Sequence, residues 1–385
     1  MKGAYIHDAV RTPRGRAHAE GGLAALTPAG LLAGLGTALA DRGRPAGMLA
    51  DQVIIGCVGQ VGAQGGHVAM VAKLAGLCAD GVPVHSINNF CASGLSAIGQ
   101  AAALVTAGQA RHVLAGGVEM MSRVPFMGDN ADYYTAADLP PVRRYIPVAL
   151  AADLLAGRLG VSRAELDAMA LMSQQRAAAA EARPALNASR IPAGRLTGEE
   201  LPRETRADGL AALRPAFAKL ADAYRPALDG AALDHRHTVA HAPPMADGAG
   251  LALVGGPGGE RPPRARILAY AEAGGDPRDS LMAGFTAMDQ ALARAGLGLA
   301  DMDRVEFMEA FAVTIAAFLR DRAIDPARVN VGGGHLAKGH PMGATGAILL
   351  SALLDALDEA DGTLGLVVAT GAQGVGVALV VERLA

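Results

Sequence analysis

The sequence predicts a layered α/β fold that is built from two copies of one strand-and-helix unit. Around Cys91 the chain runs from a polar residue through a glycine, a small-residue helix and an apolar strand to a glycine-rich turn. The same order recurs near the C-terminus, where KGHPMGATG precedes AILLSALLDALDEADG and LGLVVATGAQGVG. Each copy also opens with its own strand, GAYIHDAV or ARILAYAEA. A repeat of alternating strands and helices indicates stacked layers of both.

The individual elements follow the same repeat. LADQVIIGCV in the first half resembles LADMDRVEFMEA in the second. HVLAGG and LGLVVAT are apolar throughout, which is typical of central strands covered on both faces. We therefore divide the chain into an N-terminal half, residues 1–262, and a C-terminal half, residues 263–385.

A region of different character, about residues 123–236, interrupts the first half. Its helical run SRAELDAMALMSQQRAAAAEA begins with a capping box, Ser162 with Glu165 three residues later. Long insertions on a rigid scaffold commonly carry substrate-binding loops. We expect this insert to line the substrate pocket.

Composition excludes several classes of protein. The 385 residues carry a net charge of −3 without an extended basic cluster, so no nucleic-acid partner is expected. The opening residues lack a signal-peptide core and no apolar run reaches membrane-spanning length, so we expect a cytoplasmic protein without a membrane partner. Three cysteines argue against a disulfide framework, and neither metal-ligand spacing nor a Walker-type phosphate loop is present.

Cys91 is the candidate nucleophile. It directly precedes ASGLSAIGQAAALVTAG, a helix that we expect to end at Gly108. The positive end of a helix lowers the pKa of a thiol, and the small neighbours would let a bulky thioester approach. The alternative is a buried cysteine at the start of a core helix.

His340 stands at the equivalent turn of the second copy, in GHPMGATG. If the copies pack about a pseudo-twofold axis, His340 meets Cys91 as a base meets its nucleophile. The alternative is a turn histidine bonded to the backbone. The neighbouring glycines either make tight turns or expose N–H groups to an oxyanion.

At this point the chain resembles the thiolase family nearly from end to end. NNFCASG resembles the family's nucleophile motif, and AGGVEMMS resembles the segment that follows it. AYIHDAVRTPRGR, SRAELDAMALMSQQRA and LAALRPAF resemble the N-terminal strand and loop-domain segments. VEFMEAFA, GGGHLAKGHPMGATGA and GVGVALVVER resemble the three C-terminal blocks.

The resemblance implies a duplicated five-layer α-β-α-β-α fold with an inserted loop domain, usually as a homodimer or homotetramer. It implies an acyl-CoA C-acyltransferase that uses coenzyme A thioesters and CoA without a permanently bound cofactor. Cys91 would carry the acyl group and His340 would accept the thiol proton. Backbone N–H groups of Cys91 and Gly374 would form one oxyanion site, and His340 with a water would form the other.

Two positions depart from the family pattern. Thr370 stands where the family has a second cysteine that moves the α-proton during carbon–carbon chemistry, and a hydroxyl is a far weaker acid–base group. Met308 stands where the family usually has Asn or His at the oxyanion water. Methionine cannot donate, and losing one such donor costs about 3 kcal/mol in a transition state.

The expected coenzyme A contacts also depart. His241 replaces an asparagine and Pro243 a serine that contacts the pantetheine arm. Arg203 and Arg206 suit the CoA phosphates, although a solvated charged surface explains them equally well.

Two new polar residues precede the histidine turn. His335 or Lys338 could supply the missing proton transfer. The alternative, which we favour for each, is that His335 packs under the turn and Lys338 faces solvent.

Three functions remain open at the level of sequence. The first is a working thiolase, in which His340, or His335 through a water, covers for the absent cysteine. The second is an acyltransferase or hydrolase that passes the acyl group from Cys91 to a non-carbon acceptor, which needs no α-proton removal. The third is a non-catalytic thiolase-like partner.

Overall fold

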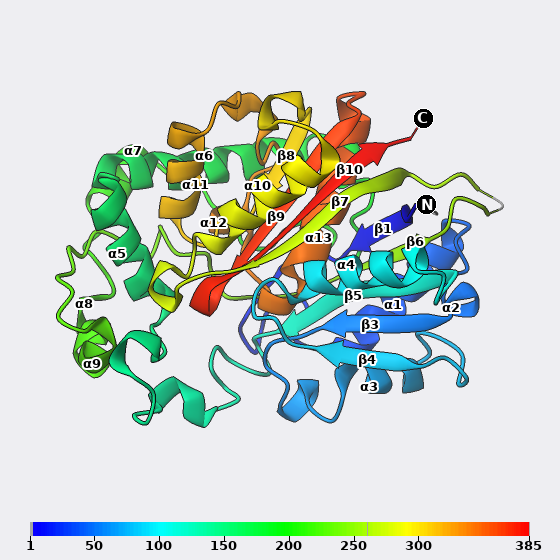
Figure 1. Cartoon of the computed structure of the whole chain (residues 1–385), viewed down its shortest axis with the longest axis horizontal. Helices are drawn as coiled ribbons and strands as arrows, with labels where there is room; N and C mark the ends of the chain where they lie inside the picture. The colour runs from blue at the N-terminus through cyan, green and yellow to red at the C-terminus, as the bar shows by residue number, and fades with distance from the viewer. Residues whose placement is uncertain (1–2, 260, 385) are drawn as a thin grey trace.

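The computed structural model describes residues 3–259 and 261–384, in which ten strands form two half-sheets (Figure 1). The half-sheets join edge to edge where Tyr5 and Ile6 pair with Arg266 and Ala265. The strands are β1 (Tyr5–Arg11), β2 (Gly15–Arg16), β3 (Gln52–Gly56), β4 (Val84–Ile87), β5 (His112–Met120), β6 (Ala246–Gly255), β7 (Ala265–Gly274), β8 (Arg304–Phe307), β9 (Leu364–Gly371) and β10 (Val375–Arg383).

The strand order confirms the internal repeat. It runs β4-β3-β5-β6-β1-β7-β10-β9-β8, with β2 attached to β6. In the first half β3 is parallel to β5, while β5, β6 and β1 are successively antiparallel. In the second half β8 is parallel to β9, while β9, β10 and β7 are successively antiparallel. Each half therefore repeats the same four-strand order and direction.

The helices form layers around the two half-sheets (Figure 1). Helices α4 and α13 contact each other and strands of both halves, α1 covers the outer face of the first half, and α10 covers the second. This is the predicted layered α/β arrangement. The helices are α1 (Pro28–Asp41), α2 (Ala46–Leu49), α3 (Val68–Leu74), α4 (Ser93–Thr106), α5 (Val148–Leu159), α6 (Arg163–Glu181), α7 (Ala207–Ala211), α8 (Ala218–Ala223), α9 (Arg225–Leu228), α10 (Ala283–Ala295), α11 (Ala312–Asp321), α12 (His335–Lys338) and α13 (Thr345–Glu359).

Small residues let the two central helices meet at their N-termini. A Cβ on Gly94 would lie 2.7 Å from the carbonyl oxygen of Gly343. A Cβ on Gly346 would lie 2.4 Å from the backbone of Leu95. Since such approaches are closed to any larger residue, the glycines of both motifs bring the turns before α4 and α13 together.

A buried carboxylate on β5 ties the turn before α13 to the loop that follows β3. Glu119 accepts hydrogen bonds from the backbone N–H groups of Val58 (2.9 Å), Gly59 (3.1 Å) and Gly343 (3.0 Å). The first two residues follow β3 in the first half, whereas Gly343 belongs to the turn before α13. Glu119 therefore holds the turn before α13 against the loop that follows β3.

We expect Glu119→Ala to lower the free energy of unfolding by about 3 kcal/mol or more, because it leaves three backbone donors unpaired in the interior. Glu119→Gln keeps an acceptor oxygen and should lose less. Chemical denaturation of both variants checks the order. Equal stability of Glu119→Ala and the wild type would contradict this role.

The insert folds over the second half as helices α5 to α9. Ser162 and Glu165 form the predicted capping box at the start of α6, with the Glu165 carboxylate accepting from the Ser162 N–H at 2.7 Å. Helix α6 then packs against α11 and α12. Within residues 3–259 and 261–384, the helices are all too short or too polar to cross a membrane.

Candidate active site

Cys91 lies in a tight turn between β4 and α4. Phe90 has a φ of 47°, an unfavourable left-handed conformation for a bulky residue, and hydrogen bonds hold it there. The Asn88 side chain accepts from the Phe90 N–H at 3.0 Å, and Ser93 Oγ donates to the Phe90 carbonyl. These contacts explain the polar and small residues around the cysteine, and they aim Cys91 into a pocket.

The surroundings of Cys91 favour the protonated thiol and not the predicted thiolate. Burial raises the pKa of the Cys91 thiol to about 12, and the Glu119 carboxylate adds to this rise. Hydrogen bonds from backbone N–H groups lower the pKa, but their effect is smaller than that of burial. Our expectation of a lowered pKa is therefore wrong, because enclosure of the sulfur outweighs the helix end. Cys91 is a thiol in the resting protein and needs a base.

The second backbone donor at Cys91 is Ala372. Its N–H bonds to the Cys91 sulfur, and the residue lines the same pocket. Gly374 instead packs on Gly275, whose carbonyl oxygen would lie 2.4 Å from a Cβ on Gly374. The prediction that Gly374 supplies this donor is therefore wrong. Ala372, the first residue of the turn between β9 and β10, is the one that faces the cysteine.

His340 offers a free ring nitrogen. Its backbone N–H donates to the Pro244 carbonyl at 2.8 Å, and its Nδ1 lies 2.8 Å from Thr345 Oγ1. Nε2 is buried, and it has no hydrogen-bond partner among the described residues. Burial lowers the pKa of His340 to about 3, so the ring is neutral in the resting protein. Met342, two residues later, lines the pocket of Cys91.

These pKa values predict a flat pH profile for the acylation of Cys91. Between pH 5 and 9 the thiol stays protonated and His340 stays neutral, so neither group changes charge. The single-turnover acylation rate should therefore vary by less than about threefold over this range. Rapid-quench mass spectrometry in constant-ionic-strength buffers measures it. A sigmoid limb centred between pH 6 and 8 would contradict this assignment.

Thr370 and Met308 contact each other and not the pocket. The Thr370 N–H donates to the Met308 sulfur at 3.4 Å. The Thr370 hydroxyl lies 3.2 Å from the Val375 carbonyl and 3.4 Å from that of Ser280. Because its hydroxyl lies against backbone carbonyls and is a weak acid–base group, Thr370 is poorly suited to move an α-proton. Met308 is 1% exposed and donates no hydrogen bond.

Glu309 supports the glycine-rich turn that leads to His340. Its carboxylate accepts from Ser173 Oγ at 2.7 Å, from Asn330 at 3.1 Å and from the Leu336 N–H at 3.0 Å. Gly334 packs against it so closely that a Cβ would lie 2.1 Å from the carboxyl carbon. The sequence alone does not single out Ser173 and Asn330, because only the fold brings α6 of the insert and the segment at Asn330 to this carboxylate.

His335 and Lys338 face different surroundings. His335 is fully buried with its ring centre 5.4 Å from that of His340, and burial holds its pKa well below the usual value. This agrees with packing under the turn. Lys338 does not face open solvent as we expected. It lies in an enclosed charged cluster with Glu199 and Glu306, where burial lowers its pKa to about 8.

The predicted coenzyme A residues lie apart from the pocket of Cys91. His241 is fully buried, with Nε2 2.7 Å from Asp167 and Nδ1 accepting from the Thr238 N–H. Both ring nitrogens are therefore occupied inside the protein, and the prediction that His241 binds CoA is wrong. Arg203 and Arg206 are exposed, and Arg206 forms an ion pair with Asp208 at 3.3 Å. Pro243 is half-buried beside Pro244.

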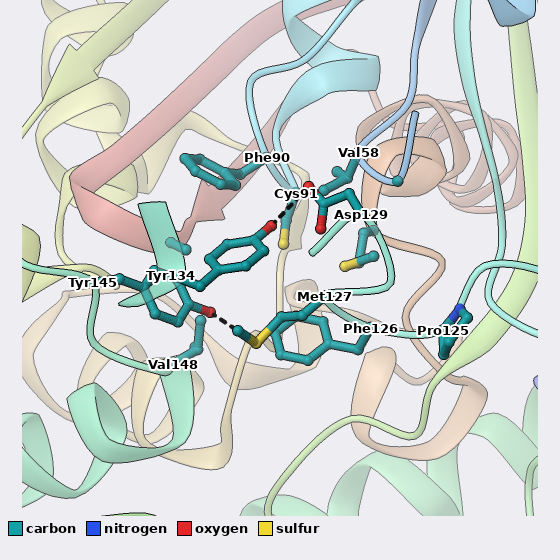
Figure 2. Close-up of a pocket in the computed structure, with 13 residues that line it drawn as sticks. Val58, Phe90, Cys91, Pro125, Phe126, Met127, Asp129, Tyr134, Tyr145 and Val148 are labelled. Atoms are coloured by element: carbon teal, nitrogen blue, oxygen red, sulfur yellow. Dashed lines mark hydrogen bonds between the residues drawn. The ribbon is translucent and has the colours of Figure 1, made fainter. Parts of the chain in front are cut away.

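Side chains of the insert form much of the lining of the pocket at Cys91 (Figure 2). The sequence indicated that the insert binds the acyl group but did not indicate which of its residues do so. The available signal was the concentration of tyrosines there: Tyr133, Tyr134, Tyr145 and Tyr224 pack against one another. The lining residues are Val58, Gly59, Phe90, Cys91, Pro125, Phe126, Met127, Asp129, Tyr134, Tyr145, Val148, Met342 and Ala372. Among the residues that the structure describes, no His/Cys/Asp/Glu group suits a metal ion.

A duplicated α/β fold in which a cysteine-bearing turn meets the equivalent histidine-bearing turn is the arrangement of an acyl-transfer enzyme class. Residues 4–233 match the N-terminal domain of thiolases, and residues 261–383 match the C-terminal domain. The chain is 34% identical to an acetyl-CoA acetyltransferase of Escherichia coli and 35% identical to a beta-ketoadipyl-CoA thiolase of Acinetobacter baylyi. Both comparisons cover 100% of each chain. The chain belongs to the thiolase family, the class of acyl-CoA C-acyltransferases.

The fold comparison agrees with this family. The crystal structure of the Bacillus anthracis acetyl-CoA acetyltransferase superposes with a TM-score of 0.85 at 28% identity, over 100% of this chain and 99% of that one. The predicted thiolase fold is therefore confirmed.

Proposed function

We propose that this protein transfers acyl groups from coenzyme A thioesters through a thioester on Cys91. The observation that carries the proposal is a neutral His340 with a free, buried Nε2, two residues before Met342, which lines the pocket that holds the Cys91 thiol. His340 takes the thiol proton as the sulfur attacks the thioester carbonyl. The N–H groups of Cys91 and Ala372 bind the oxyanion, and CoA leaves with the proton from His340.

The second half-reaction is carbon–carbon bond formation or its thiolytic reverse. After CoA has left, His340 is neutral again and can remove an α-proton from acetyl-CoA. The resulting enolate attacks the acyl carbonyl on Cys91 and releases the thiol as a 3-oxoacyl-CoA forms. Because the hydroxyl of Thr370 is directed to backbone carbonyls, His340 acts as the acid–base group of both halves.

The contact between Thr370 and Met308 favours a second candidate function. Transfer of the acyl group to an amine, alcohol, thiol or water removes no α-proton, so neither substitution obstructs it. A non-catalytic partner is less well supported, since it would not require the free Nε2 of His340 or the access to Cys91.

Restoring the family residues distinguishes these candidates. If the protein performs carbon–carbon chemistry, wild type cleaves acetoacetyl-CoA with CoA, and Thr370→Cys combined with Met308→Asn raises kcat about 10²-fold. Thr370→Ser is the matched control, because it keeps a hydroxyl, and it should gain nothing. Product formation is followed by chromatography of the CoA esters. If wild type loads Cys91 yet never makes or cleaves 3-oxoacyl-CoA, the second candidate function replaces the first.

Membership of the family supports proposals about the location, assembly and ligands of the protein. We propose a cytoplasmic homodimer or homotetramer that uses acyl-CoA and CoA and holds no permanent cofactor. Exposed apolar side chains on α2 and α3 support assembly, since a monomer gains nothing from displaying them. They are Met48, Leu49, Met70, Val71 and Leu74.

A further inference from the structure

We infer that the pocket at Cys91 selects short acyl groups that carry a hydroxyl or an ammonium at the end remote from the thioester, and that Asp129 recognises this donor. The inference rests on the proposed function, since it concerns the group carried by Cys91. An acyl group bonded to the Cys91 sulfur must occupy the pocket into which that sulfur opens.

The walls of the pocket are largely apolar and leave a narrow space (Figure 2). Val58, Phe126, Val148 and Met342 contribute aliphatic and aromatic surface from both halves and the insert. Such walls accept a short carbon chain and have no room for a long one. Any selectivity beyond length must come from the few polar groups in the lining.

Those polar groups are Asp129, Tyr134 and Tyr145. The Tyr134 hydroxyl donates to Asp129 Oδ2 at 3.0 Å, and the Tyr145 hydroxyl points to the Met127 sulfur at 3.8 Å. A carboxylate accepts about four hydrogen bonds. Within the described residues, the Asp129 side chain receives only the one from Tyr134. Its remaining acceptor capacity is open to a ligand.

The charge of Asp129 is not neutralised by the lining. Arginine, lysine and histidine are absent from the described residues that form the pocket. A half-buried carboxylate beside apolar walls attracts a donor or a cation and repels another carboxylate. It also disfavours an apolar acyl end, which would cover the carboxylate without pairing with it. The pocket therefore distinguishes acyl groups of equal length by their terminal group.

Four donors test this discrimination: butyryl-CoA, 3-hydroxypropionyl-CoA, 3-aminopropionyl-CoA and succinyl-CoA. The first three differ only in a terminal methyl, hydroxyl or ammonium, and the fourth ends in a carboxylate. The readout is the single-turnover rate of Cys91 acylation, followed by protein mass. We expect the hydroxyl and ammonium donors to react about tenfold faster than butyryl-CoA, and succinyl-CoA to be the slowest.

The variants assign the effect to one side chain. Asp129→Asn keeps an acceptor but removes the charge, so it should abolish the ammonium preference, retain part of the hydroxyl preference and accelerate succinyl-CoA. Asp129→Leu should abolish both preferences. Asp132→Asn, a charge-matched change at an exposed site in the same loop, should leave all four rates unchanged. Tyr134→Phe keeps the carboxylate, so the ammonium preference should persist and provide a second test if an Asp129 variant misfolds.

Two results would overturn this inference and leave the proposed function standing. One is the same order of donors in wild type and both Asp129 variants. The other is an equal loss for all four donors, which would place Asp129 on the CoA portion that they share. Failure of wild type to form an adduct with any donor would instead overturn the proposed function, and the inference with it.

Discussion

Replacing Cys91 by serine should lower the rate of acyl transfer at least about 10³-fold, because the acyl-accepting atom becomes a poorly nucleophilic hydroxyl. The turn around Cys91 is held by Asn88, Ser93 and the left-handed Phe90, none of which the substitution touches. The variant should therefore fold normally, with the loss confined to turnover. Steady-state release of CoA from acyl-CoA measures this.

Cys78→Ser is the control for this loss. Cys78 is half-buried in a loop of the first half and lies outside the lining of the Cys91 pocket, so its replacement should leave turnover unchanged. A Cys91→Ser variant that retains turnover within about tenfold of wild type would exclude a covalent cysteine mechanism.

Replacing His340 by alanine should lower acyl transfer by about 10²- to 10⁴-fold, the usual contribution of a general base. The reason is the raised pKa of the Cys91 thiol, which leaves almost no thiolate at neutral pH without a proton acceptor. The variant should also acquire a new pH dependence, with the rate rising steadily toward alkaline pH as hydroxide replaces the imidazole. Single-turnover acylation from pH 6 to 10 measures both effects.

His335→Ala provides the comparison for His340→Ala. The His335 ring is buried and, like the His340 ring, stands outside the pocket lining, but it packs under the turn that carries His340. If His335→Ala impairs acylation as severely as His340→Ala and acquires the same alkaline rise, the assignment of His340 as the base is wrong.

The features of this fold that are local in the chain could be predicted from its sequence. Each motif specifies its own turn and helix, so the repeat, the capping box at Ser162 and the end of α4 before Gly108 were recognisable. The glycines that allow α4 and α13 to meet belong to the same motifs as Cys91 and His340. The two motifs could therefore be paired from the order of their residues alone.

The features that depend on how distant parts of the chain surround a side chain could not be predicted from the sequence. The pKa of Cys91 depends on how many atoms surround its sulfur, which no local pattern records. The choice of Ala372 over Gly374 depends on which residue of a three-residue turn faces the cysteine. His241 was assigned to coenzyme A by its position in a motif, but the insert supplies Asp167 and buries it.

The most direct test of the account is the mass of the intact protein after mixing with acetyl-CoA, with the adduct then located by peptide mapping. We predict one acetyl group per chain, released CoA in equal amount, and the modification on the peptide that contains Cys91. An unmodified protein with every short acyl-CoA, or an acetyl group on any other residue, would contradict the assignment of Cys91 as the acyl carrier.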